Sequence, residues 1–208
     1  MKPALIVMII VVAVSFGIDI AGNILRKKYY AEMVELVNQK KYDEFEQLAN
    51  KKLVKVAVSR FDVEYLRLNA VLENGSRRQI DEQFKRIIDC SMNNYQKVDS
   101  LMLAFDYYLS AEDAGKAKEY GRMITELNSP ELSSYVKRMY DIRINRSARF
   151  LNEMLEELKD GNVSNRWQKE YMVSLMYEIN GDTQHQKEYE QLSKQHLAEM
   201  GEAMKGRK

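Results

Sequence analysis

The residue types that most often carry out chemistry in proteins are scarce in this chain, and their spacing does not bring them together. The two histidines, His185 and His196, stand eleven positions apart. Metal sites on helices place ligands three or four positions apart, so that both side chains reach one ion. Neither histidine has a second His or a Cys at that spacing. The sequence therefore predicts no metal site.

Nucleophile and phosphate motifs are also missing from the sequence. Cys90 has no histidine near it, and a lone Cys of this kind is typical of a small buried hydrophobe. Neither the GxxxxGK[ST] loop nor the GxGxxG loop occurs. We therefore expect no enzyme and no cofactor. An active site assembled across distant segments stays open as an alternative, and it would need a deep polar pocket with convergent titratable groups.

The composition predicts an almost entirely helical protein. The 208 residues include only 2 prolines and 9 glycines, whereas residues that favour helices are abundant. The 32 Lys and Arg residues nearly balance the 31 Asp and Glu residues. A nucleic-acid-binding surface needs an excess of bases, so we expect a protein or peptide partner and no nucleic acid.

The N-terminal residues 1–25 have the character of a membrane anchor. Residues 4–18 carry no charge, and the basic triplet from Arg26 to Lys28 follows the apolar stretch. At about 1.5 Å per residue, residues 3–25 span roughly 35 Å as a helix, enough to cross about 30 Å of hydrocarbon. A cleaved signal peptide is the alternative, since Ala13-Val14-Ser15 resembles a cleavage site, but Lys2 is the only base before the apolar stretch. We predict an uncleaved single-pass transmembrane helix.

Two features of the predicted anchor concern its neighbours and its orientation. Ala13, Gly17 and Ala21 recur every four residues, a pattern that lets helices pack closely in a membrane. Helix pairing in the membrane is therefore a possibility, and the oligomeric state stays open. The bases that follow the anchor outnumber those before it, which places the C-terminal part in the cytoplasm by the positive-inside rule.

Beyond the anchor, helical segments alternate with turn signals in units of about 34 residues. Asn74-Gly75, Ser129-Pro130 and Asn180-Gly181 are typical helix stops. One hairpin cannot bury its apolar face alone, so neighbouring hairpins must stack into a continuous core. Residues 201–208 are expected to be a frayed polar tail. The predicted helix pairs are 24–38 with 42–53, 61–74 with 77–91, 97–110 with 113–127, 131–144 with 146–159, and 166–179 with 183–200.

Two of these units carry the details of a known repeat. Residues 101–131, LMLAFDYYLSAEDAGKAKEYGRMITELNSPE, contain an apolar first helix, an acidic turn, a second helix with a small Ala117, and the trailing Pro130. Residues 171–192, YMVSLMYEINGDTQHQKEYEQL, follow the same order with an Asn-Gly-Asp turn. The chain resembles a divergent, membrane-anchored tetratricopeptide-repeat (TPR) protein. This resemblance implies an all-α fold, in which the transmembrane helix precedes a right-handed α-α solenoid of about five hairpins over residues 26–200.

The repeat alignment places aromatic residues in one column of the first, or A, helices. The resemblance implies that this column lies near a concave groove where TPR proteins bind peptides. In one interpretation, these residues contact a bound partner peptide along the groove. In the other, they pack in the core between helices, because Tyr65, Leu68 and Leu72 follow the spacing of one buried helix face. One tyrosine is able to do both. The column consists of Tyr30, Tyr65, Met102, Tyr135 and Tyr171.

These observations together predict a membrane-tethered scaffold that binds a partner peptide or helix in the groove. The resemblance leaves a second function open, that of an extracytoplasmic, chaperone-like accessory protein in export or envelope assembly.

Overall fold

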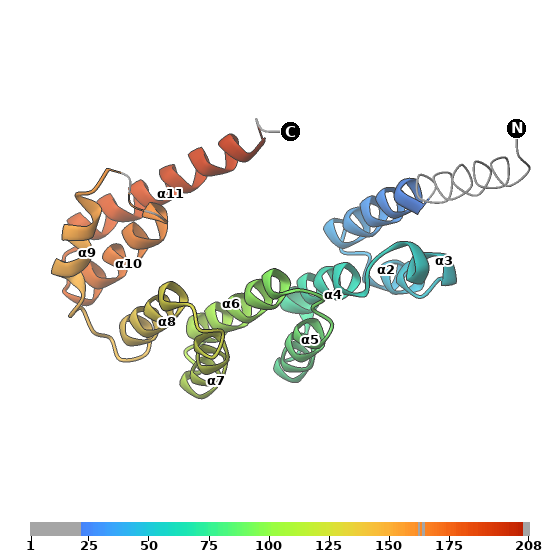
Figure 1. The fold of residues 1–208 in the computed structure, drawn as a ribbon, viewed down its shortest axis with the longest axis horizontal. Coiled ribbons are helices and arrows are strands. Elements are labelled where there is room, and N and C mark those ends of the chain that lie inside the picture. Colours follow the sequence, from blue (N-terminus) through green and yellow to red (C-terminus); the bar gives the residue numbers. More distant parts are fainter. Residues whose placement is uncertain (1–21, 162, 164, 206–208) are drawn as a thin grey trace, which may run out of the picture. The chain divides into compact units, whose positions relative to one another are not determined.

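The computed structural model describes residues 22–161, 163 and 165–205, with side chains as far as residue 202. These residues form helices joined by short turns and contain no strand, which confirms the all-α fold class (Figure 1). The chain divides into two compact units, Met1–Ser100 and Leu101–Lys208, and the boundary falls within α6 (Asn94–Ser110). Each unit is described by itself.

The first unit contains one helix more than the repeat pattern predicts. The segment predicted as a single helix over 42–53 breaks at Asn50-Lys51, and a separate short helix follows. Buried side chains from four helices form one core, with Met33, Phe45, Val54 and Leu66 each at most 4% exposed. The helices are the one over residues 22–38, α2 (Tyr42–Ala49), α3 (Lys52–Ala57), α4 (Arg60–Asn74), α5 (Arg77–Asp89) and the start of α6.

The helix starts of the first unit follow capping chemistry. The Ser59 hydroxyl accepts a hydrogen bond from the Asp62 amide at the start of α4. Ser76 and Gln79 form a capping box that starts α5. Such contacts pair backbone N–H groups that the helix itself leaves without partners. The predicted turn at Asn74-Gly75 therefore lies where α4 ends and α5 begins.

The second unit is built from five helices and the end of α6. Leu101, Phe105, Ile124, Ile142 and Met154 are fully buried in it. Ser129 caps α8 and Pro130 occupies the first turn of that helix, the place where a missing N–H costs least. The helices are α7 (Ala114–Thr125), α8 (Pro130–Arg143), α9 (Leu151–Leu158), α10 (Arg166–Ile179) and α11 (Thr183–Lys205).

The helix predicted over 146–159 begins only at Leu151. Instead, the residues before it turn back onto the end of α8. The Ser147 amide donates to the Asp141 carbonyl at 3.2 Å, and Asn145 Nδ2 donates to Asp141 Oδ1 at 2.7 Å. Arg149 adds an ion pair to Asp141 Oδ2. These local bonds hold residues 145–149 against the end of α8 and so delay the start of α9.

Most of the predicted anchor over residues 1–25 is outside the described part of the chain, whereas its last four residues, 22–25, belong to the first described helix. Residues 1–21, with the small residues Ala13, Gly17 and Ala21, lie beyond the described residues. Among the helices that are described, none is both long enough and apolar enough to cross a membrane. At the other end, α11 continues to Lys205, so the first part of the tail predicted to fray is helical.

One glycine lets three helices of the second unit approach closely. A Cβ atom placed on Gly121 of α7 would lie 2.9 Å from Val136 Cγ1 and 3.3 Å from Phe105 Cε2. Val136 is a stiff, β-branched residue of α8, and Phe105 is a fully buried ring of α6. Neither neighbour has room to move aside in a packed core.

We expect Gly121→Ala to lower the free energy of unfolding by about 1–3 kcal/mol, because overpacking outweighs the gain in helix propensity. Gly115→Ala on the same helix is the matched control, since its nearest neighbour would be Asp113 Oδ1 at 3.5 Å. That variant should be unchanged or more stable by up to about 1 kcal/mol. Urea denaturation followed by the fluorescence of Trp167, the chain's one tryptophan, measures both. Equal effects of the two substitutions would contradict the close approach.

Candidate functional site

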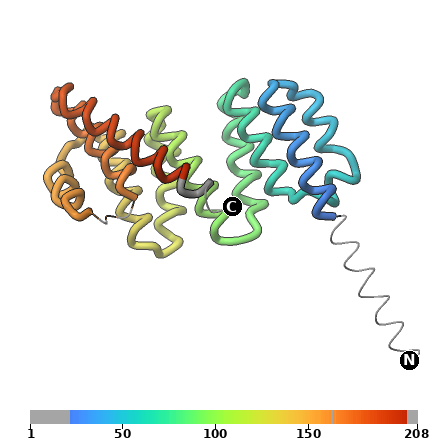
Figure 2. Tube along the Cα trace, turned by 90° about the horizontal axis from the view of Figure 1, so that it is seen from above, coloured from blue at the N-terminus to red at the C-terminus, as the bar shows by residue number. Residues whose placement is uncertain are grey.

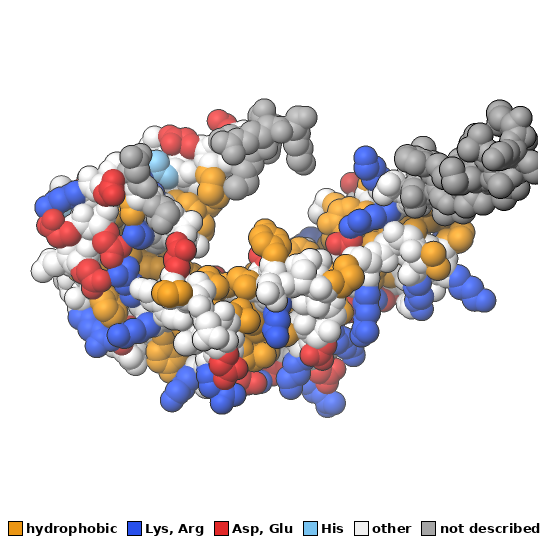
Figure 3. Space-filling view, viewed as in Figure 1, with side chains coloured by type: hydrophobic (Ala, Val, Ile, Leu, Met, Phe, Trp, Pro, Cys, Tyr) orange, Lys and Arg blue, Asp and Glu red, His pale blue; other side chains and the backbone are white. Residues whose placement is uncertain are grey.

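A hollow of about 190 Å³ lies between the three A helices of the second unit, α6, α8 and α10. Two of the predicted residues, Tyr135 and Tyr171, line it together, with aromatic, apolar and charged neighbours. In Figure 3, hydrophobic side chains gather over α6 and α8 on the hollowed face of this unit. The complete lining is Asp106, Leu109, Ser110, Tyr135, Met139, Arg143, Trp167, Gln168 and Tyr171.

Tyr135 joins the core to this hollow. Its ring packs edge-on against the buried ring of Phe105, with a centroid distance of 6.4 Å. Its hydroxyl donates a hydrogen bond to Asp106 Oδ1 at 3.0 Å. A single side chain therefore packs against the core with its ring and presents its polar end to the lining, which combines the two interpretations of the tyrosine column.

The Asp106–Tyr135 pair has unusual electrostatics. Burial raises the pKa of Asp106 to about 6, although the hydrogen bond from Tyr135 acts in the opposite direction. Burial also raises the pKa of Tyr135 above its ordinary value, and the charge of Asp106 adds to that effect. Within the described residues, no Lys or Arg side chain forms an ion pair with Asp106. The hollow thus holds a carboxylate that is largely desolvated and bonded to one neutral donor.

A second hollow, of about 370 Å³, adjoins the first, because Tyr135 and Gln168 line both. Three of its charged lining residues are held in ion pairs, whereas Glu131 accepts a hydrogen bond from Asn165 Nδ2. Arg138 contacts Glu153 at 2.6 Å and Glu157 at 2.7 Å, and Lys169 contacts Glu157 at 2.5 Å. The hydrogen bond from Arg138 is the main reason that the pKa of Glu157 is lowered. This cluster joins α8, α9 and α10, and its charges compensate one another.

The remaining residues of the predicted column lie elsewhere. Met102 is half-buried on α6, one turn before Asp106. In the first unit, Tyr30 is 39% exposed, and Tyr65 is half-buried. Burial raises the pKa of Tyr65, and the proximity of Asp99, Tyr30 and Tyr95 adds to it. The column residues are therefore neighbours within each unit, Tyr30 with Tyr65 and Tyr135 with Tyr171.

Sequence reasoning did not find Asp106 or Trp167. The signal was present, because Asp106 follows Met102 by four residues and Trp167 precedes Tyr171 by four. Residues four apart lie on the same face of a helix. Extending the column by one turn toward the C-terminus would have included Asp106, and extending it by one turn toward the N-terminus would have included Trp167.

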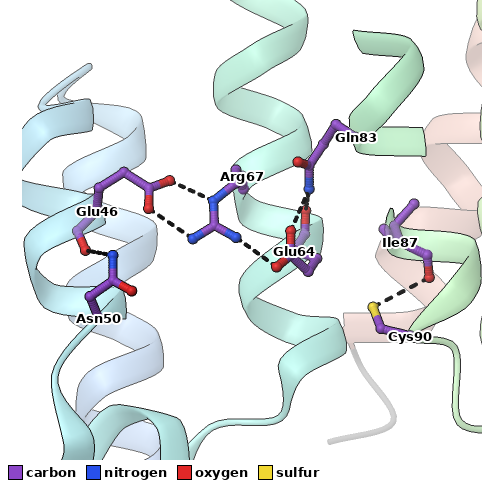
Figure 4. Close-up of polar contacts among 7 residues, drawn as sticks. All are labelled: Glu46, Asn50, Glu64, Arg67, Gln83, Ile87 and Cys90. Carbon is purple, nitrogen blue, oxygen red and sulfur yellow. Dashed lines mark hydrogen bonds and ion pairs between the residues drawn. The ribbon is translucent and has the colours of Figure 1, made fainter. Parts of the chain in front are cut away.

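A polar network centred on Arg67 joins three helices of the first unit (Figure 4). Arg67 donates to Glu46 through Nε at 2.5 Å and Nη2 at 2.8 Å, and to Glu64 through Nη1 at 2.7 Å. The buried Glu64 also accepts from Gln83 Nε2 at 2.8 Å. Burial raises the pKa of Glu64, but the hydrogen bonds from Gln83 and Arg67 outweigh it and leave that pKa below its ordinary value. The network therefore joins α2, α4 and α5.

The residues considered first for chemistry have structural surroundings. Cys90 Sγ donates to the Ile87 carbonyl at 3.4 Å (Figure 4), and burial raises the pKa of the thiol, which disfavours the reactive thiolate. His196 Nδ1 lies 2.7 Å from Oε2 of the buried Glu170, and so joins α11 to α10. Within the described ranges, no three His, Cys, Asp or Glu residues come close enough together to hold a metal ion.

A scan against protein-family models and searches of curated proteins and solved structures found no match to this chain. The TPR resemblance therefore rests on the sequence units themselves and stays a prediction.

The raised pKa of Asp106 predicts a pH dependence of stability. The unfolded chain has an Asp pKa of about 4, whereas the folded value is about 6. Ionised Asp106 therefore weakens the fold above about pH 6, and this penalty disappears as the pH falls from about 6 to about 4. Asp106→Asn retains an acceptor for Tyr135 without the charge.

We expect Asp106→Asn to be more stable than the wild type at about pH 7.5, and the difference to vanish near pH 4. Urea denaturation across this pH range, followed by Trp167 fluorescence, measures it. Glu199→Gln, an exposed substitution on α11, is the control and should leave the profile unchanged. A constant difference between Asp106→Asn and wild type at every pH would contradict the pKa assignment.

Proposed function

We propose that this chain is a membrane-tethered binding module of TPR-like hairpins, and that the hollow between α6, α8 and α10 holds a segment of a partner protein. The observation that carries the proposal is the juxtaposition of Tyr135, Tyr171, Trp167 and Asp106 in one lining. These residues come from three A helices, which is where the TPR resemblance places a peptide groove.

The chemistry of the lining favours recognition of a peptide. Aromatic rings supply a large contact area for little loss of conformational entropy. Tyr171 is 38% exposed at the hollow, so its ring is available to a ligand. The Asp106 carboxylate has capacity to accept further hydrogen bonds, and a desolvated carboxylate gains from each N–H that it receives. A segment with an apolar side chain next to a backbone or basic N–H matches this arrangement.

The same surroundings favour binding over catalysis. Asp106 and Tyr135 bond to each other, and Arg138, Glu157 and Lys169 of the adjoining hollow are held in ion pairs. These groups orient one another between neighbouring helices. A general acid or base needs to reach a reacting group on a substrate, and the ion pairs of Arg138, Glu157 and Lys169 oppose this in the adjoining hollow.

A peptide-binding experiment tests this function. Peptides selected from a random library on the full chain should change the fluorescence of Trp167, because it lines the hollow. Tyr171→Ala should weaken their binding at least tenfold, which corresponds to about 1.4 kcal/mol. The control is Leu197→Ala on α11, a residue with a similar exposure of 42% that does not line the hollow.

Binding that survives Tyr171→Ala unchanged, in a variant with wild-type circular dichroism, would contradict the proposed groove. An equal loss of affinity in Leu197→Ala would do so as well, because it would place the binding surface on α11.

The tether and its orientation form the second part of the proposal. The apolar residues 1–25 and the triplet from Arg26 to Lys28 support an uncleaved anchor with the helical units on the cytoplasmic side. A reporter that is active only in the cytoplasm, fused after Lys208, should be active in a product of full length. A shortened product would show cleavage. An inactive cytoplasmic reporter would support the alternative of an extracytoplasmic, chaperone-like protein.

A further inference from the structure

The exposed hydrophobic side chains of the first unit gather at one edge. Among the described residues of this unit, seven large hydrophobic side chains are exposed, and all except Tyr30 lie in the first described turn of the helix over 22–38, in α3, or at or just before the start of α6. Val56 is 88% exposed and Tyr95 is 80% exposed, values that few apolar side chains of packed helices reach. The six residues, which we call the apolar edge, are Ile24, Leu25, Leu53, Val56, Met92 and Tyr95.

Specific contacts bring the three A-helix starts together. Arg26 at the start of the helix over 22–38 forms an ion pair with Asp62 at the start of α4, at 2.9 Å. Tyr29 of that helix and Val54 of α3 belong to the same hydrophobic cluster, so both helices pack into one core. Tyr95 lies close enough to Tyr65 to affect its pKa, which joins the start of α6 to α4. Figures 1 and 2 show α3 beside the beginning of the first described helix.

The opposite edge of the same unit has a different character. The turns at residues 39–41 and 75–78 contain no exposed large hydrophobic side chain within the described chain. They carry Lys40, Lys41, Arg77 and Arg78 instead. The apolar edge is therefore a property of one side of the unit.

The short helix α3 explains how the apolar edge is built. In its sequence KLVKVA, Val54 points inward and is fully buried, whereas Leu53 and Val56 point outward. Lys52 and Lys55 are exposed beside them, and no acid occurs between Glu46 and Asp62. Among the described residues, neither lysine forms an ion pair. Apolar tips surrounded by uncompensated lysines are typical of helices that lie in the headgroup region of an anionic bilayer.

The position of the edge in the chain identifies what covers it. The exposed bases Lys27 and Lys28 stand at this edge, at the first described turns of the chain. In the sequence, the uncharged stretch over residues 4–18 ends four positions before Gly22, the first described residue. A bilayer that holds this stretch would bring its headgroups to the start of the helix over 22–38, next to α3.

We propose that the apolar edge of the first unit rests on an anionic lipid surface, with Leu53 and Val56 inserted among the headgroups and Lys52 and Lys55 paired with lipid phosphates. This inference rests on the proposed tether and is independent of the peptide groove. The edge would hold the first unit in a defined orientation on the membrane.

Depth-dependent quenching on the full chain tests the proposal. Val56→Cys, in a chain that also carries Cys90→Ser, is labelled with a fluorophore and reconstituted into phosphatidylcholine vesicles with or without phosphatidylglycerol. Arg78→Cys in the same background is the matched control, because its side chain is 89% exposed at the opposite edge. Quenchers carried on the lipid acyl chains then report contact of each label with the bilayer.

We expect quenching at position 56 to be severalfold stronger than at position 78 in the anionic vesicles. Lys52→Glu together with Lys55→Glu should reduce the quenching at position 56 to the level at position 78, as should the omission of phosphatidylglycerol. Circular dichroism of the double variant checks that the helices remain.

Three results would overturn the inference. Equal quenching at positions 56 and 78 in chains that float with the vesicles would show that the tether holds but the edge does not touch the lipid. A photoreactive label at position 56 that cross-links to protein and not to lipid in the anionic vesicles would show that protein covers the edge. A chain that fails to float with the vesicles would refute the tether itself, together with this inference.

Discussion

The structure depends on the fact that a single helix hairpin is unable to bury its own apolar face. In the first unit, Met33, Phe45, Val54 and Leu66 come from four different helices and meet in one core. In the second unit, α7 approaches α6 and α8 so closely that only a glycine fits at position 121. Each helix is therefore placed by its neighbours, and an A helix packs on one face while part of another face remains accessible.

Tyr135 shows how this constraint shapes the proposed binding surface. Its ring packs on Phe105, and its hydroxyl meets Asp106 in the hollow. The fold thereby fixes the polar end of the ring without any flexible loop. Preorganised groups of this kind lose little entropy when a ligand binds. The two units differ in how they use their exposed hydrophobic residues: the second presents Tyr171 to the hollow, whereas the first presents Leu53 and Val56 at its edge.

Local chemistry made much of the fold predictable. Asn74-Gly75 lies where α4 ends, and Ser129-Pro130 lies where α8 begins. Both were predictable because helix caps and stops act within a few residues. The break before α3 and the turn between α8 and α9 were missed for a different reason. The turn is stabilised by bonds from residues 145–149 to Asp141, and such a set of contacts is visible only in three dimensions.

The candidate site was predictable to a smaller extent. Periodicity led to Tyr135 and Tyr171, but it could not distinguish a groove from a core, since both follow the same helical spacing. Asp106 was indistinguishable from the solvated acids of other helices, because its burial depends on α8. Likewise, Leu53 and Val56 had the pattern of core residues, and only the packing of α3 shows that they point outward.

The central claim is that the hollow between α6, α8 and α10 binds a segment of a partner protein. The most direct measurement is a crystal structure of the full chain with a peptide selected for binding to it. The account predicts that the peptide lies across Tyr171 and Trp167 and donates a hydrogen bond to Asp106. A peptide bound elsewhere on the chain, with this lining left empty, would contradict the claim.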